Sequence, residues 1–137
     1  MPRALGLDLG SRRIGVAISD SDGSVATPIE VIDGRDRPRA RRRVVDLVTE
    51  WEAEVVVVGH PLSLDGTEGP AARAARVEAD ELATMVGVPV ELHDERLTTV
   101  TAHQTLKELD MSGAARRQVV DQVAAAVLLQ SWLDGER

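Results

Sequence analysis

Apolar residues alternate with small or polar ones at the start of the chain, and this alternation predicts a β-strand. The segment 4–9 has leucine at every second position, and Asp8 falls on the opposite face. Two further apolar segments, 14–20 and 25–32, follow after short turns, and Pro28 suits an edge strand. Three strands with tight connections predict an antiparallel meander.

The periodicity becomes helical after residue 38 and then alternates between strands and helices. One stripe of the first predicted helix is apolar and holds Val44, Leu47, Val48 and Trp51. Four consecutive valines, 55–58, indicate a strand covered on both faces. A second helix is predicted over 70–86, with Ala74, Val77, Leu82 and Met85 facing inward and Arg73, Arg76, Glu78 and Asp80 facing outward.

A fifth strand is predicted at 89–93, and two helices follow it. The first of these helices is predicted to begin at Thr98 or Thr99, which are good N-caps, and to end near residue 109. The second is predicted over 114–133. The resulting order, β-β-β-α-β-α-β-α-α, predicts one α/β domain over residues 1–137.

Composition excludes several classes of protein. The chain is 43% hydrophobic and has no cysteine, which excludes a disulfide framework and a thiolate metal site. No apolar run approaches the roughly 20 residues of a membrane span, and no signal peptide precedes the first strand, so we expect a cytoplasmic protein without membrane contact. Phenylalanine and tyrosine are absent, which argues against base-stacking platforms.

A local basic cluster stands out against the acidic net charge of −7, which is unusual for a nucleic-acid-binding protein. Segment 35–43 holds six arginines, among them Arg39 and Arg42, and one aspartate. Counterion release is a local effect, so such a cluster can bind phosphate on an acidic protein. The alternative is a solvated helix face. Cations at a helix N-terminus oppose the helix dipole, so local helix stability does not explain the cluster.

Asp8 is the first candidate site residue, because it lies between Gly6 and Gly10 on an inner strand. Charged residues are rarely buried unless they are paired or bind metal, and glycine in a strand often marks close approach by a ligand. We therefore interpret the two glycines as room for metal and phosphate. The alternative is a strand that simply ends in an Asp-x-Gly turn.

Two more acidic features suggest a metal site. Asp121 falls on an apolar face of the last helix. The alternatives are that it lies near solvent at the start of the helix or pairs with Arg116 or Arg117. Asp94 and Glu95 end the fifth strand, beside Arg96. Carboxylates that converge without cysteine suit hard cations such as Mg²⁺ or Mn²⁺. Two such ions can clamp the attacking and leaving oxygens of a phosphodiester.

The chain resembles the YqgF/RuvX family, which is assigned to pre-16S rRNA processing or to Holliday junction resolution. The matching segments are GLDLGSRRIGVAISD at 6–20, VVGHPL at 57–62, HDERLTT at 93–99 and VDQVAA at 120–125. They occur in order over nearly the whole chain. The resemblance implies an RNase H-like fold, with a five-stranded mixed sheet in the order 3-2-1-4-5 and helices on both faces.

The resemblance also implies roles for individual residues. Asp8, Glu95 and Asp121 would be the catalytic, metal-binding acids, with Asp94 as the alternate acid. Arg12 and Arg96 would lie near the scissile phosphate.

The fourth strand departs from many RNase H-like nucleases, because it ends in Gly59-His60-Pro61 without a carboxylate. His60 is either a site histidine or a turn substitution.

Three classes of function follow from these features. The leading hypothesis is a metal-dependent nuclease that acts on pre-16S rRNA or, as the alternative, on branched DNA. The segment Asp8–Ser11 also resembles a phosphate loop of actin-like ATPases. The third hypothesis is a non-catalytic RNA- or ribosome-associated factor that uses the arginines of segment 35–43. The expected partner is nucleic acid, and the expected state is a monomer or weak homodimer.

Overall fold

A computed structural model describes residues 3–97 and 113–135 of the chain. The elements are β1 (Ala4–Leu9), β2 (Arg13–Ser19), β3 (Ala26–Asp33), α1 (Arg37–Glu50), β4 (Val55–His60), α2 (Pro70–Ala83), β5 (Val90–Asp94), the 3₁₀ turn η1 (Glu95–Leu97) and α4 (Gly113–Gly135). The helix predicted to begin at Thr98 or Thr99 lies outside the described residues.

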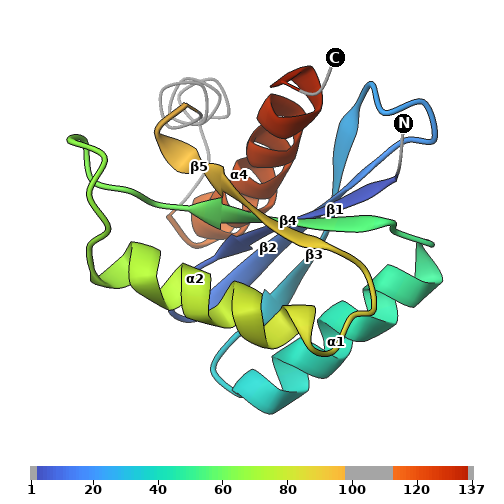
Figure 1. Cartoon of the computed structure of the whole chain (residues 1–137), viewed down its shortest axis with the longest axis horizontal. Helices are drawn as coiled ribbons and strands as arrows, with labels where there is room; N and C mark the ends of the chain where they lie inside the picture. Colours follow the sequence, from blue (N-terminus) through green and yellow to red (C-terminus); the bar gives the residue numbers. More distant parts are fainter. Residues whose placement is uncertain (1–2, 98–112, 136–137) are drawn as a thin grey trace.

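The five strands form one mixed sheet in the order β3-β2-β1-β4-β5 (Figure 1). β1 pairs antiparallel with β2, and β2 with β3, so the predicted meander is confirmed. β4 is parallel to both β1 and β5. The sheet therefore has the predicted order 3-2-1-4-5. The carboxyl ends of β1, β4 and β5 meet at one end of the sheet, where sheets of this kind place ligands.

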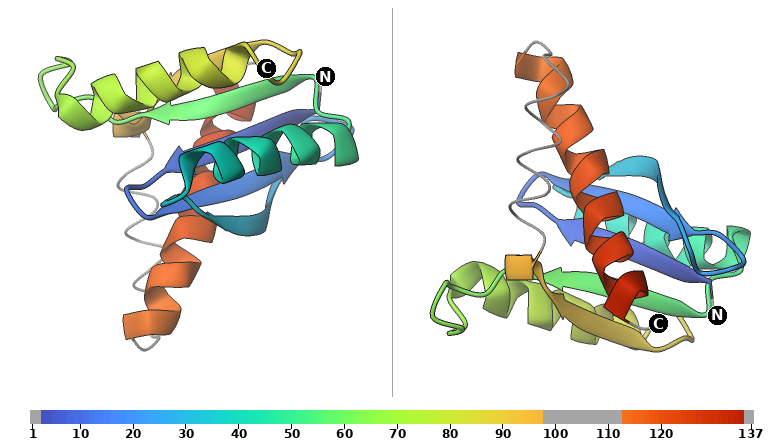
Figure 2. Two further views of the ribbon diagram at one scale, coloured as in Figure 1. Left: turned by 90° about the horizontal axis from the view of Figure 1, so that it is seen from below. Right: turned by 90° about the horizontal axis from the view of Figure 1, so that it is seen from above.

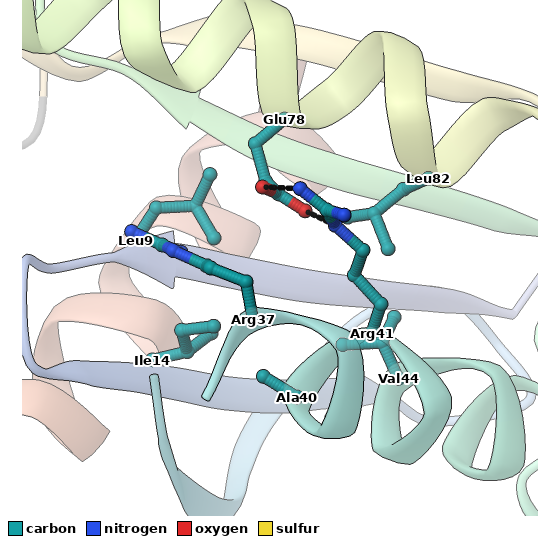
Figure 3. Close-up of a pocket in the computed structure, with 8 residues that line it drawn as sticks. All are labelled: Leu9, Ile14, Arg37, Ala40, Arg41, Val44, Glu78 and Leu82. Atoms are coloured by element: carbon teal, nitrogen blue, oxygen red, sulfur yellow. Dashed lines mark hydrogen bonds and ion pairs between the residues drawn. The ribbon is translucent and has the colours of Figure 1, made fainter. Parts of the chain in front are cut away.

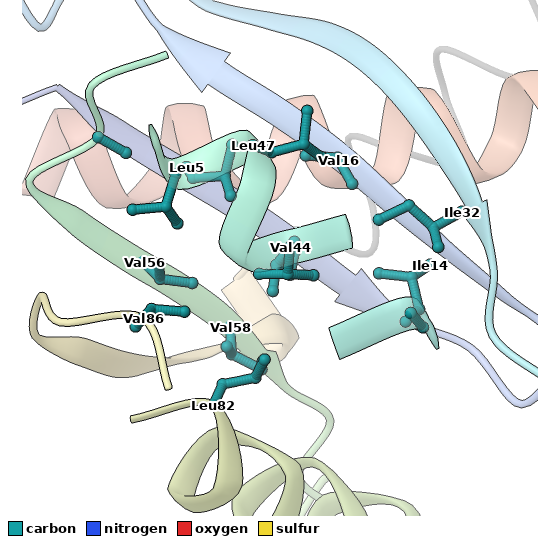
Figure 4. Close-up of a cluster of buried hydrophobic side chains, with 14 of the residues drawn as sticks. Leu5, Ile14, Val16, Ile32, Val44, Leu47, Val56, Val58, Leu82 and Val86 are labelled. Atoms are coloured by element: carbon teal, nitrogen blue, oxygen red, sulfur yellow. The ribbon is translucent and has the colours of Figure 1, made fainter. Parts of the chain in front are cut away.

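Helices α1 and α2 cover one face of the sheet. The leucines of β1 point toward this face, where they pack with valines of β4 and with apolar residues of both helices (Figure 4). The largest fully buried members of this core are Leu5, Leu7, Val16, Val44, Leu47, Val56, Val58 and Leu82.

Helix α4 covers the opposite face, as the views in Figure 2 show. Ala4, Gly6 and Asp8 alternate with the leucines and so point toward this face. A Cβ on Gly6 would lie only 2.8 Å from Cβ of Leu129, so the missing side chain lets α4 pack directly on β1. The interpretation of Gly6 as room for metal is therefore wrong, because α4 fills that room.

The inner face of α2 differs from the predicted one. Its buried residues are Ala72, Ala75, Glu78, Ala79 and Leu82. Ala74, Val77 and Met85 were predicted to face inward but are exposed, Val77 to 55% and Met85 to 40%. Glu78 is buried because Arg41 of α1 binds its carboxylate through two hydrogen bonds of 2.8 and 3.0 Å. This ion pair joins the two helices.

Among the described residues, none of the helices combines the length and apolar character needed to cross a membrane.

Candidate functional site

The carboxyl groups of Asp8 and Glu95 contact each other at the carboxyl end of the parallel strands. Asp8 is half-buried near the end of β1 and faces the α4 side of the sheet. Glu95 is the first residue of η1, directly after β5. A side-chain hydrogen bond joins the two acids. The structure thus brings together two of the three acids that the sequence nominated.

Gly59 makes this contact possible. β4 lies between β1 and β5, so the side chain of Glu95 must cross β4 to reach Asp8. A Cβ on Gly59 would overlap Oε1 of Glu95 and would lie 2.8 Å from its Cδ. Neighbouring strands are about 4.8 Å apart, so the side chains of Glu95 and Asp8 together bridge roughly two strand spacings over a position without a side chain. This role of Gly59 was not predicted, although a glycine directly after four consecutive valines is a visible signal in the sequence.

The paired acids compete for ionisation. Burial raises the pKa of Glu95 to about 8, and the hydrogen bond and negative charge of Asp8 and the charge of Asp94 add to the effect. The metal-free pair therefore favours one proton shared between the two carboxyl groups. A divalent cation between the two carboxylates would replace that proton. The all-oxygen donor set fits Mg²⁺ or Mn²⁺, which prefer carboxylate ligands.

Asp94 is engaged elsewhere. Its carboxylate accepts hydrogen bonds of 2.6 to 3.1 Å from the guanidinium of Arg96, and these hold its pKa below the ordinary value. Arg96 also donates to the carbonyl of Leu64, at 3.4 Å. The geometry therefore places Glu95, rather than Asp94, against Asp8, while Asp94 orients Arg96.

Asp121 lies in α4, but its side chain is outside the described part of the structure. Ala125, Leu128 and Trp132, which the helical pattern groups with Asp121, are all buried. Within the described residues, no group of three or more acidic or histidine side chains could hold a metal ion. A third acidic ligand therefore remains a prediction.

The predicted arginines are dispersed. Arg12 is exposed in the turn after β1, at the same end of the sheet as Asp8. Arg39 and Arg42 are exposed on α1, and Arg39 lines a cleft with β3, the strand at the far edge from β5. Three other arginines of segment 35–43 are held in ion pairs with carboxylates, namely Arg35, Arg41 and Arg43.

Gly10 and His60 lie next to the paired acids, at the start of the connections that follow β1 and β4. Gly10 donates to the carbonyl of Arg13 at 2.8 Å, and a Cβ on Gly10 would lie 2.6 Å from that oxygen, so the tight turn requires glycine. His60 bonds to Glu68 at 3.0 Å, and Glu68 also accepts from Arg76. Glu68 therefore ties the loop after β4 both to His60 of β4 and to Arg76 of α2.

Comparisons with known proteins agree with this architecture. A family model, RuvX, described as Holliday junction resolvase, matches residues 2–135. Relatives carry the name "Putative pre-16S rRNA nuclease". The protein of Streptomyces avermitilis is 51% identical over 136 residues, with 98% of this chain and 87% of the relative covered. That of Myxococcus xanthus is 49% identical over 135 residues, with 98% and 89% covered.

Two solved structures share the fold. Thermus thermophilus RuvC in complex with Holliday junction substrate has a TM-score of 0.61 at 18% identity, covering 99% of this chain and 96% of that one. The fowlpox virus resolvase, in complex with its substrate Holliday junction DNA, has a TM-score of 0.58 at 12% identity, covering 98% of both chains. At these identities the likeness establishes the RuvC-like, RNase H-type fold.

Proposed function

The chain belongs to the RuvX family, and from this premise we propose that it is a metal-dependent nuclease that hydrolyses phosphodiester bonds during maturation of the 5′ end of pre-16S rRNA. The observation that carries this proposal is the contact between Asp8 and Glu95 across Gly59. Two carboxyl groups that share a proton in a half-buried position are costly to the fold, and a catalytic or metal-binding role explains why they are there.

The acids Asp8, Glu95 and Asp121 would hold the metal, as two Mg²⁺ or Mn²⁺ ions. When bound, such ions lower the pKa of the attacking water and stabilise the charge that develops on the leaving 3′ oxygen. Asp8 and Glu95 would bind through oxygens that face the α4 side of the sheet. Glu95 must lose its proton to do so, because a protonated carboxyl group is a poor ligand.

Arg12 and Arg96 are the candidates for orienting the scissile phosphate. Both lie at the carboxyl end of the sheet, close in sequence to one of the two acids. Asp94 and the carbonyl of Leu64 hold the Arg96 guanidinium in place, which reduces the entropy it would lose on binding phosphate. Arg39 and Arg42 lie on α1 and would contact more distant parts of a substrate strand.

The substrate is the part of the proposal that depends on the relatives. Their name, at about half identity over nearly the whole chain, supports pre-16S rRNA. The description of the family model supports a second candidate, the Holliday junction, which is branched DNA.

We place the reaction in the cytoplasm and in a single nuclease domain spanning residues 1–137. A symmetric cut of two strands would need a dimer, whereas trimming of a leader would not.

One preparation can test both candidates. The purified protein is incubated with a pre-16S rRNA leader and with a four-way DNA junction, with Mg²⁺, with Mn²⁺ and with a chelator. We expect metal-dependent cleavage of the RNA, abolished by Asp8→Asn, with the fold retained by circular dichroism. Cleavage of the junction alone would show that branched DNA, rather than pre-16S rRNA, is the substrate. Activity that survives Asp8→Asn or Asp121→Asn would show that the substituted residue is not part of the catalytic site.

A further inference from the structure

An open cleft of about 620 Å³ lies on the α1–α2 side of the sheet, beyond the end of β1. Its walls are the first turns of the two helices, and its floor includes Leu9 and Gly10. The ion pair between Arg41 and Glu78, drawn as dashed lines in Figure 3, is part of its lining. We call this hollow the α1–α2 cleft.

Two cations in the α1–α2 cleft have no evident structural task. Arg37 is the first residue of α1, and Figure 3 shows its side chain running toward Leu9; Arg73 lies in the first turn of α2. Within the described part of the chain, neither guanidinium forms a hydrogen bond or an ion pair. Cations in a first helical turn oppose the helix dipole, so neither position is explained by helix stability.

The remaining lining suits a nucleotide. Among the described residues, Glu78 is the only acid that lines the α1–α2 cleft, and Arg41 neutralises it, so the described lining carries a net positive charge. Val77 is 55% exposed and adds an apolar wall, and Ala74 leaves space beside it. The cleft thus combines two cations that can neutralise a phosphate with a small apolar surface that can contact a sugar.

The α1–α2 cleft and the acid pair lie at the same end of β1, on opposite faces of the sheet. Asp8 and Leu9 are successive residues of β1, so their side chains point to opposite faces of the sheet. Asp8 faces α4 and the contact with Glu95, while Leu9 lines the cleft. A strand bound at the acids can therefore pass over the end of the sheet and enter the cleft within a few nucleotides.

We propose that the α1–α2 cleft binds a backbone phosphate and its nucleoside on the substrate strand, outside the bond that is cleaved, with Arg37 and Arg73 as the phosphate ligands. This inference rests on the proposed nuclease function. It adds that the length of the substrate strand determines how tightly the strand is bound. Enzyme and substrate would thus meet at two places, one on each face of the sheet. A substrate too short to reach over the end of β1 would lose the second contact.

The test measures RNA binding in the Asp8→Asn background, which prevents cleavage. A labelled single-stranded RNA with the pre-16S leader sequence is titrated at several salt concentrations against the parent and Arg37→Gln/Arg73→Gln. Loss of this phosphate contact should reduce the salt slope of log Kd by about 0.7, since each neutralised phosphate contributes about 0.7 on a single strand. The control is Thr49→Glu/Ala83→Glu, which changes net charge equally at exposed positions outside the cleft and should keep the parental slope.

A neutral variant and a short substrate separate a binding site from a general electrostatic field. Ala74→Leu fills part of the α1–α2 cleft without changing charge and should weaken binding of the long RNA. An oligonucleotide that spans only the cleaved bond and its neighbours should bind all variants equally. Equal slopes for the double variant and its control would overturn the proposal, as would equal losses on short and long RNA. If the parent protein binds neither RNA, the proposed function fails together with this inference.

Discussion

Replacing Glu95 by glutamine should stabilise the metal-free protein while removing its metal site. The carboxyl group of Glu95 is held over Gly59 against Asp8, where burial and the neighbouring acid raise its pKa to about 8 from 4.5. Glutamine has nearly the same shape and keeps an N–H that can donate to Asp8. Glutamine does not ionise, so the unfolded state no longer gains stability by releasing a proton that the folded state holds.

The size of the effect follows from proton linkage. Between its unfolded pKa of 4.5 and its folded pKa of about 8, Glu95 binds more protons in the folded state, so its contribution to stability is lost as the pH rises through this window. Each pH unit corresponds to about 1.4 kcal/mol. At pH 7, Glu95→Gln should therefore raise the free energy of unfolding by about 3 kcal/mol, and below about pH 4.5 the difference should vanish.

Urea denaturation with a chelator, repeated from acid to mildly alkaline pH, measures this difference. Glu54→Gln, at an exposed position, is the matched control and should shift stability by no more than about 0.5 kcal/mol at any pH. Added Mg²⁺ should stabilise the parent protein and not the Glu95→Gln variant, because a ligand that binds only the folded state raises its stability. A variant that is less stable than the parent at pH 7, or a difference that does not change with pH, would refute the reasoning.

Three further substitutions test the packing around the site. Gly59→Ala should remove most cleavage activity with little loss of stability, because its Cβ displaces only the flexible end of Glu95; unchanged activity in a cleavage assay would contradict this. Gly6→Ala should cost about 2 kcal/mol in urea denaturation, since its Cβ would lie 2.8 Å from a leucine Cβ of α4. Glu78→Gln should cost about 2 kcal/mol in the same assay by leaving Arg41 without its carboxylate; a stable variant would count against that ion pair.

The strands and their order could be predicted because they depend on local patterns and on a family resemblance. The leucine alternation of β1 placed Asp8 on the correct face, and the valines of β4 are buried on both faces. The three helices that the structure describes, α1, α2 and α4, were located within a few residues by their periodicity. Such patterns predict secondary structure because residues close together in the sequence determine which face of a strand or helix is buried.

The face of α2 could not be predicted in the same way. Its alanines are small enough to lie on either side of a helix, so they define the apolar stripe poorly. The ordinary rule puts glutamate outside, but Glu78 is buried because Arg41, 37 residues earlier, supplies its partner. Only the tertiary structure shows that pair, and Val77 is left exposed as a consequence.

The candidate site depends even more on contacts between distant segments. The sequence nominated Asp8 and left Asp94 and Glu95 as alternatives, because alternation cannot be followed past the end of β5. The structure separates them through Gly59, whose missing side chain lets Glu95 cross a whole strand. A glycine that ends a buried strand of an α/β sheet is thus as informative as the acids themselves, since it marks where a side chain from the next strand can reach the centre of the sheet.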